Sequence, residues 1–116
     1  MIIELEKFLQ GSGNVSGIKY TQIYFCNNAF LYSCMQNGII THFEVFERKL
    51  VPLCVDFEKK IYSDVDFKEI FPKDKDFGNW AWTYKSLFEA EKKYQEIQAR
   101  ILNELNKTQD YERKEN

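Results

Sequence analysis

The fold is decided by residues 30–45, which read FLYSCMQNGIITHFEV. Asn37-Gly38 lies between two runs of β-branched and aromatic residues, and this dipeptide is the preferred centre of a two-residue type I′ turn. The sequence therefore predicts an antiparallel β-hairpin. Counting outward from the turn, the expected cross-strand pairs are Gln36 with Ile39, Cys34 with Thr41, Tyr32 with Phe43, and Phe30 with Val45.

This predicted register divides the hairpin into an apolar face and a more polar face. Successive side chains of a strand point to opposite sides, so most aromatic side chains fall on one face, which we expect to be core. The other face carries Ser33, His42 and Glu44. Cys34 falls on the apolar face, so the register separates it from His42 and argues against a Cys/His dyad. His42 and Glu44 are acid–base residue types, but no motif places a nucleophile beside them, so no catalytic residue is predicted.

Two elements are expected ahead of the hairpin. Residues 2–10 have apolar side chains at helical spacing and precede Gly11, a common C-cap residue, so they predict a short N-terminal helix. The glycine-rich residues 11–17 follow this helix instead of a strand, which indicates a linker and not a nucleotide-binding loop. Residues 18–25 are mostly β-branched or aromatic and predict a strand.

Further elements are expected after the hairpin. Residues 50–57 have strand character, and Pro52 favours a sheet edge because it lacks an amide donor. Residues 58–78 are turn-rich with mixed charge, so we expect a long connection containing one helical turn at residues 66–71. Alternation in residues 80–84 predicts a last short strand.

The C-terminal part of the sequence predicts a long amphipathic helix. Ser86 and Glu89 have the spacing of a capping box at a helix start. The helix is expected to run to Leu105 and to be followed by a polar tail at residues 106–116. Its predicted apolar face consists of Leu87, Ala90, Tyr94, Ile97, Ile101 and Leu105.

These elements together predict an α+β fold. We expect an antiparallel sheet of four or five strands, packed against the long C-terminal helix, with the short N-terminal helix at one edge. The chain has 116 residues, of which 44% are hydrophobic, so one domain over residues 1–105 has enough apolar material for a core. The acidic N-terminus does not resemble a signal peptide and no run is long enough for a membrane span, so a cytoplasmic protein without membrane contact is expected.

The sequence predicts neither a metal site nor a cofactor. Cys26, Cys34 and Cys54 form no Cys-x-x-Cys pair, and with one histidine they do not supply a usual four-ligand zinc shell. All three are interpreted as reduced core thiols. The acidic pairs at residues 64–66 and 74–76 lack the glycine and glutamate that complete a calcium loop.

Two groups of residues are candidates for contact with a partner. The aromatic pair Trp80 and Trp82 could anchor an interface, with core packing as the simpler interpretation. The net charge of −2 gives no overall attraction to nucleic acid, so such binding needs a local basic patch. Candidate partner-binding residues are Arg48, Lys49, Lys59, Lys60, Trp80 and Trp82, joined by Lys19 for a nucleic-acid interface.

Two motifs carry a resemblance to a known group of proteins. The segment Phe43-Glu44-Val45-Phe46 and the later Phe77-Gly78-Asn79-Trp80-Ala81-Trp82 precede an amphipathic helix. This pattern over residues 20–100 resembles short uncharacterised proteins of bacteriophages and other mobile elements. The resemblance implies a mobile-element origin, and small acidic proteins of such elements include anti-CRISPR inhibitors.

The expected function is therefore binding of another macromolecule without catalysis. On the strength of the resemblance, the expected role is inhibition of a host defence nuclease such as a CRISPR effector, bound alone or with its RNA. The alternative is a nucleic-acid-binding accessory module that combines the basic residues with exposed aromatic rings.

Overall fold

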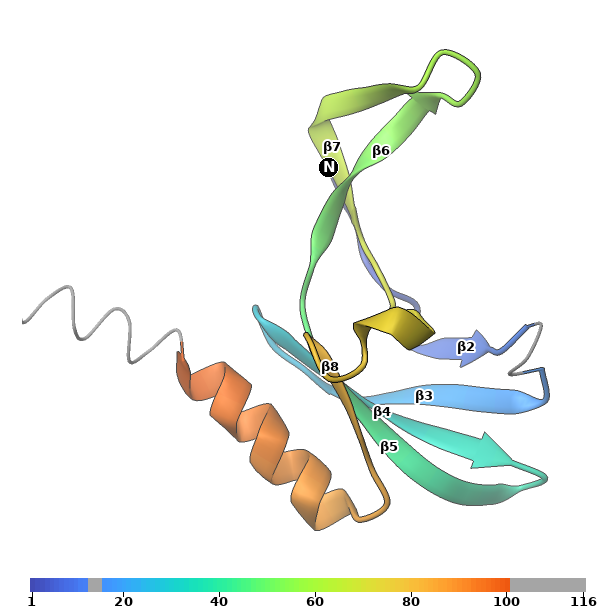
Figure 1. Cartoon of the computed structure of the whole chain (residues 1–116), viewed down its shortest axis with the longest axis vertical. Coiled ribbons are helices and arrows are strands. Elements are labelled where there is room, and N and C mark those ends of the chain that lie inside the picture. Colours follow the sequence, from blue (N-terminus) through green and yellow to red (C-terminus); the bar gives the residue numbers. More distant parts are fainter. Residues whose placement is uncertain (13–15, 101–116) are drawn as a thin grey trace, which may run out of the picture.

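The computed structural model describes residues 1–12 and 16–100 and confirms the α+β class (Figure 1). Five strands form one antiparallel sheet in the order β2-β3-β4-β5-β8, and three form a second sheet in the order β1-β7-β6. The described part of the C-terminal helix spans residues 87–100. The other elements are β1 (Ile2–Ile3), β2 (Phe8–Gln10), β3 (Ile18–Phe25), β4 (Ala29–Gln36), β5 (Ile39–Glu47), β6 (Leu50–Asp56), β7 (Ile61–Glu69), the 3₁₀ turn η2 (Asp74–Asp76) and β8 (Ala81–Tyr84).

The predicted turn between β4 and β5 is confirmed. Asn37 and Gly38 both have left-handed backbone conformations, with φ of 54° and 78°, as a type I′ turn requires. Gln36 pairs with Ile39 on either side of the turn, as predicted.

A β-bulge at Thr41 makes the rest of the predicted register wrong. Cys34 pairs with His42 and not with Thr41, because β5 carries one extra residue at this point. A shift of one residue moves side chains to the other face of the sheet, so His42 and Glu44 now share a face with Cys34. The pairs beyond the bulge are Ser33 with Phe43, Tyr32 with Glu44, Leu31 with Val45, and Phe30 with Phe46.

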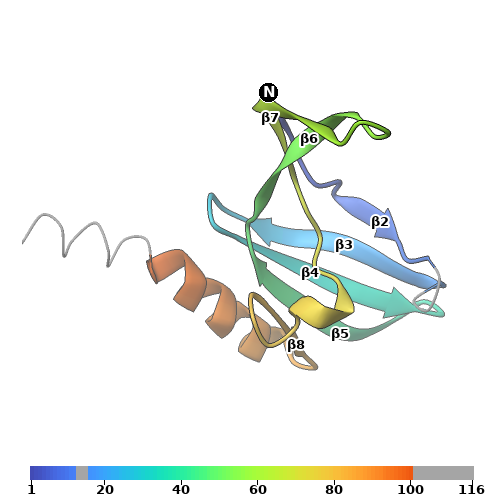
Figure 2. The same cartoon turned by 45° about the horizontal axis from the view of Figure 1, so that its top comes forward.

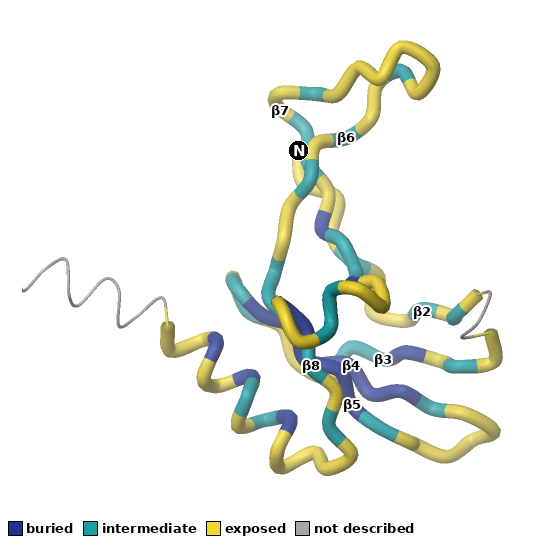
Figure 3. The backbone as a smooth tube through the Cα atoms, in the orientation of Figure 1, coloured by how far each residue is buried: buried dark blue, intermediate teal, exposed yellow. Residues whose placement is uncertain are grey.

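The five-stranded sheet is buried on both faces, where the sequence predicts a single core face. β4 is the central strand, and Figure 3 shows most of it as buried. Its side chains alternate between two cores. One core is aromatic and contains Tyr20, Phe30, Tyr32, Cys34, Phe46, Trp80 and Ala81. The other faces the C-terminal helix and contains Ala29, Leu31, Phe43, Val45, Ala90, Tyr94 and Ile97.

The C-terminal helix packs on the second of these faces, as Figure 1 shows. Its predicted start is confirmed, since the Glu89 amide donates to Ser86 Oγ at 3.4 Å. Ala90, Tyr94 and Ile97 are buried as expected, whereas Leu87, predicted on the same face, is exposed because it lies in the first turn, beyond the edge of the core. Residues 101–116, which include the last helical turns and the tail predicted from the sequence, lie outside the described residues.

The three-stranded sheet forms an arm that projects from the five-stranded sheet (Figures 1 and 2). β7 runs through residues 61–69 of the stretch predicted as a long connection and covers the start of the helical turn predicted at residues 66–71, so that prediction is wrong. Residues 61–69 include four charged side chains, which favoured the loop prediction, but they form a strand that pairs with β6 and β1.

The predicted N-terminal helix is also wrong. Residues 2 and 3 pair in parallel with β7, and residues 8–10 pair with β3. Leu5 and Leu9 still pack on the aromatic core, so the apolar spacing reflects burial in an extended segment. No helix in the described part of the chain is long and apolar enough to cross a membrane.

Candidate functional site

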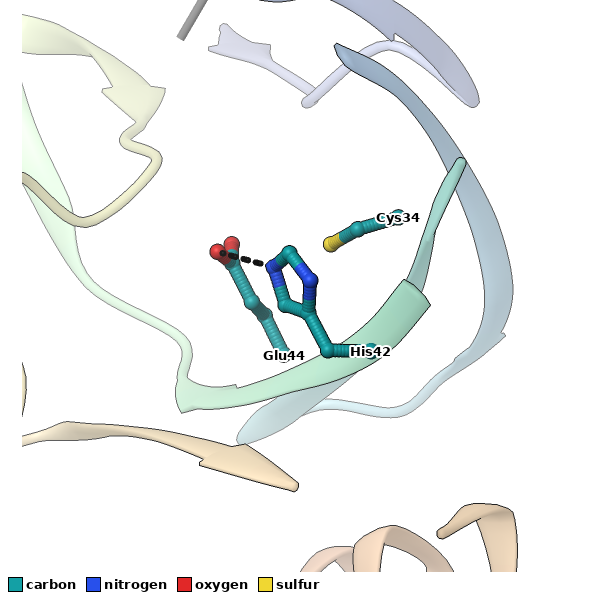
Figure 4. A group of neighbouring side chains, drawn as sticks. All are labelled: Cys34, His42 and Glu44. Carbon is teal, nitrogen blue, oxygen red and sulfur yellow. Dashed lines mark ion pairs between the residues drawn. The ribbon is translucent and has the colours of Figure 1, made fainter. Parts of the chain in front are cut away.

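Cys34, His42 and Glu44 form a cluster on the aromatic-core face of the five-stranded sheet (Figure 4). One ligand-type atom from each residue lies within 4.8 Å of the other two: a thiol sulfur, an imidazole nitrogen and a carboxylate oxygen. Cys34 comes from β4, and the other two residues come from β5 at alternate positions. The β-bulge at Thr41 creates this cluster, because the regular register would place Cys34 on the opposite face from His42.

Thr41 also orients the His42 ring. Its hydroxyl donates to the Cys34 carbonyl oxygen at 3.3 Å, so its oxygen is free to accept from His42 Nδ1, 2.8 Å away. With the proton on Nδ1, the Nε2 lone pair points toward Glu44, whose Oε1 lies 3.5 Å from Nε2. Burial lowers the pKa of His42, so the neutral ring and the carboxyl group do not form an ordinary salt bridge at neutral pH.

Glu44 is a buried carboxyl group that pairs with no lysine or arginine among the described residues. Its side chain is 9% exposed, and Oε2 has no hydrogen-bond partner in the described part of the chain. Burial, assisted by the nearby Asp74, raises the pKa of Glu44 to about 7. A buried carboxyl group in this state indicates a site that takes up a proton or a cation.

Cys34 is not an activated nucleophile by itself. The residue is fully buried, and burial together with Glu44 raises the pKa of its thiol well above the usual range. A reactive cysteine needs the opposite shift, toward the thiolate. The prediction that all three cysteines lie in the core is confirmed for Cys34 and wrong for Cys54, which is exposed. Cys26 is half-buried.

A cavity of about 280 Å³ adjoins the cluster at Glu44. The sheet contributes Tyr20 and Glu44 to its wall, and the segment before β8 contributes Phe71 and Asp74. Residues 9–12, Pro72 and Phe77 form the rest of the wall. Glu44 therefore links the buried Cys34 and the half-buried His42 to a space large enough for water and a small ligand.

The basic residues predicted to contact a partner are not brought together. Arg48 is engaged with the buried carboxylate of Glu69, and the Lys49 ammonium lies 5.1 Å from the centre of the Trp80 ring. Lys59 and Lys60 lie at the far end of the arm and are exposed.

The two predicted tryptophans belong to different sides of the sheet. Trp80 is buried in the aromatic core, with 7% of its surface exposed. Trp82 is half-buried beside the helix-facing core, and the Lys93 ammonium lies 4.1 Å from the centre of its ring. Neither ring stands free on the surface, so the structure gives no support to an anchoring role for this pair.

The arm carries an apolar surface that the sequence analysis did not identify. Residues 50–57 were expected to form a strand at a sheet edge, and their sequence carried no signal that its apolar side chains would be exposed. Phe57 is 87% exposed, and Val55 and Val65 are each 68% exposed. The other exposed apolar side chains of the arm are Met1, Ile2, Ile3, Leu50, Ile61 and Tyr62.

Comparison of the chain with protein-family models, curated proteins and solved structures gives no match.

Proposed function

We propose that the chain is a non-enzymatic protein-binding module that contacts its partner with the β6–β7 arm. The supporting observation is the exposure of large apolar side chains at the end of the arm, above all Phe57 and Val55. Exposed apolar patches on a folded protein mark interaction surfaces, because their exposure to water is otherwise unfavourable.

The chemistry of the arm favours a protein over a nucleic acid as the partner. Lys59 and Lys60 are flanked by Asp56 and Glu58, so the tip lacks the unbroken positive charge that binds phosphates. Apolar anchors instead fit an apolar cleft on a protein surface. The proposed role, inhibition of a host defence nuclease such as a CRISPR effector, comes from the sequence resemblance.

Binding to purified CRISPR effectors, each with and without guide RNA, tests this proposal. We expect one effector to bind the intact chain and to lose nuclease activity. The double variant Val55→Ser/Phe57→Ser should bind at least about tenfold more weakly, because loss of a hot-spot side chain from an interface costs about 2 kcal/mol. The matched control is Ile39→Ser, which removes an apolar side chain as exposed as Val55, at 68%, from the start of β5.

Three outcomes would count against the proposal. The first is a panel in which no effector binds. The second is equal binding by the double variant and the Ile39→Ser control, which would exclude the arm. The third is binding to single-stranded RNA or DNA that weakens steeply as salt increases, which would support the nucleic-acid-binding alternative.

A further inference from the structure

We propose that Cys34, His42 and Glu44 bind a divalent transition-metal ion, zinc by its ligand chemistry, through Sγ, Nε2 and a carboxylate oxygen. This inference is independent of the proposed function of the arm. It depends on the arrangement of the three side chains and on the unpaired oxygen of Glu44.

The ligand set matches zinc in number, type and spacing. Zinc binds cysteine sulfur, histidine nitrogen and carboxylate oxygen, and sites that retain an open position use three protein ligands. Bonds of about 2.0 Å at tetrahedral angles separate a nitrogen and an oxygen ligand by about 3.3 Å. The observed distance from His42 Nε2 to Glu44 Oε1 is 3.5 Å, and the sulfur lies within the same 4.8 Å cluster.

The surroundings of His42 supply the usual support for a metal ligand. A metal-bound histidine commonly donates its other ring N–H to an oxygen atom, which fixes the ring and selects the bonding nitrogen. Thr41 Oγ1 provides this acceptor at Nδ1, and its own proton is directed to the Cys34 carbonyl oxygen. The bulge residue therefore directs Nε2 toward Glu44 and Cys34.

Glu44 provides the independent observation that points to a cation. Its side chain is about nine-tenths buried, and Oε2 has no partner among residues 1–12 and 16–100. A proton shared with His42 Nε2 would serve only Oε1 and would leave Oε2 unsatisfied. A cation bound between the three residues attracts both carboxylate oxygens and converts the Cys34 thiol to a thiolate.

The adjoining cavity gives the fourth coordination position an opening. Glu44 lines this space together with Tyr20 and Asp74, whereas Cys34 is closed off from solvent. A water molecule or an anionic group of a small ligand fits at this position.

Metal titration of the purified chain tests this site. We expect Zn²⁺ to bind with one-to-one stoichiometry in a competition assay with a chromophoric chelator. Co²⁺ should give the visible bands of a tetrahedral ion and a thiolate-to-metal charge-transfer band. Cys34→Ser should abolish the charge-transfer band, and His42→Gln and Glu44→Gln should abolish stoichiometric Zn²⁺ binding. Thr41→Val, which removes the support of His42, should weaken binding by about 10-fold to 100-fold.

Matched variants keep the result interpretable. Cys54→Ser removes an exposed cysteine, and Glu47→Gln removes the carboxylate that follows Glu44 in β5. Both variants should bind Zn²⁺ like the unmodified chain. Circular dichroism of each variant separates loss of a ligand from loss of the fold. If a ligand variant does not fold, the Zn²⁺ affinity of Thr41→Val still tests the site. The proposal is overturned if the unmodified chain does not bind Zn²⁺, or if binding survives in folded His42→Gln. Loss of binding in Cys54→Ser would also overturn it.

Discussion

Cys34 and His42 are direct cross-strand partners in the β4–β5 ladder, although regular counting from the Asn37-Gly38 turn pairs Cys34 with Thr41. The one-residue bulge reverses the faces of all β5 side chains beyond it. It brings a thiol, an imidazole and a carboxyl group together, and it gives the sheet an aromatic core on the same side. The local backbone irregularity thus determines both the packing and the candidate metal site.

The buried ion pair between Arg48 and Glu69 should hold the base of the arm in place. Glu69 is 3% exposed and also accepts a hydrogen bond from the Leu5 amide at 2.8 Å, so it joins three segments. Arg48→Met leaves the buried carboxylate without its cation and should lower the free energy of unfolding by about 3 kcal/mol, measured by urea denaturation. Arg100→Gln, which breaks the solvent-exposed pair with Glu47, should cost less than about 1 kcal/mol. Equal losses in the two variants would contradict the anchoring role of Glu69.

Ile97 should contribute strongly to the attachment of the C-terminal helix. Its side chain is 2% exposed and packs with Leu31 and Val45 of the sheet. Ile97→Ala should lower the free energy of unfolding by about 2–5 kcal/mol, because it leaves a cavity between helix and sheet. Phe88 lies on the same helix but is 70% exposed, and Phe88→Ala should change stability by no more than about 0.5 kcal/mol. Thermal and urea unfolding of both variants provide the comparison. A loss of unfolding free energy in Ile97→Ala as small as that in Phe88→Ala would mean that the helix does not pack on the sheet.

Alkaline pH should destabilise the fold through Tyr32. Burial raises the pKa of Tyr32 to about 12, whereas a tyrosine in the unfolded chain ionises near pH 10. The folded state therefore holds this proton over a range in which the unfolded state loses it. The resulting stability is fully present below about pH 10 and is lost as the pH rises toward 12.

Unfolding free energies measured across this pH range test the contribution of Tyr32. Tyr32→Phe also loses two hydrogen bonds, one from the Gln22 amide and one to the Glu6 carbonyl oxygen. The informative quantity is therefore the slope of the unfolding free energy against pH and not the absolute stability. The slope should be shallower in the variant; an unchanged slope would mean that Tyr32 does not retain its proton. Tyr20, whose pKa is also raised to about 12 by burial, accounts for part of the remaining slope.

The apolar tip of the arm should add almost nothing to the stability of the free chain. Phe57 and Val55 are so exposed that their replacement by serine removes few internal contacts. Val55→Ser/Phe57→Ser should therefore unfold within about 0.5 kcal/mol of the unmodified chain. A loss of unfolding free energy well above about 1 kcal/mol in urea denaturation would show that these side chains pack within the fold and are not available to contact a partner.

Local signals were sufficient to predict several elements of this fold. A type I′ turn requires two left-handed residues, which Asn37 and Gly38 adopt readily, so this dipeptide predicted the turn. The Ser86 cap and the spacing of Ala90, Tyr94 and Ile97 predicted the helix. These features depend on residues that are close in sequence, which is why pattern analysis found them.

Features set by contacts between distant segments were not predictable in the same way. Residues 2–10 have helical spacing, but pairing with β7 and β3 makes them extended. The bulge at Thr41 has no strong sequence signal, because threonine is also common in regular strands. The position of the bulge decides whether Cys34 and His42 share a face. Because the bulge was not predicted, both the register and the candidate site were missed.

A cross-strand disulfide tests the bulged register most directly. In a background of Cys26→Ser and Cys54→Ser, Cys34 is the only remaining thiol, and a second cysteine is introduced by His42→Cys or, in a separate protein, by Thr41→Cys. Directly opposed residues have Cβ atoms about 4.5–5.5 Å apart, close enough to be oxidised to a disulfide with small adjustments. Mass spectrometry after mild oxidation should show rapid cross-linking for His42→Cys and little for Thr41→Cys. Preferential cross-linking of Thr41→Cys would establish the regular register and would contradict the shared face of Cys34, His42 and Glu44.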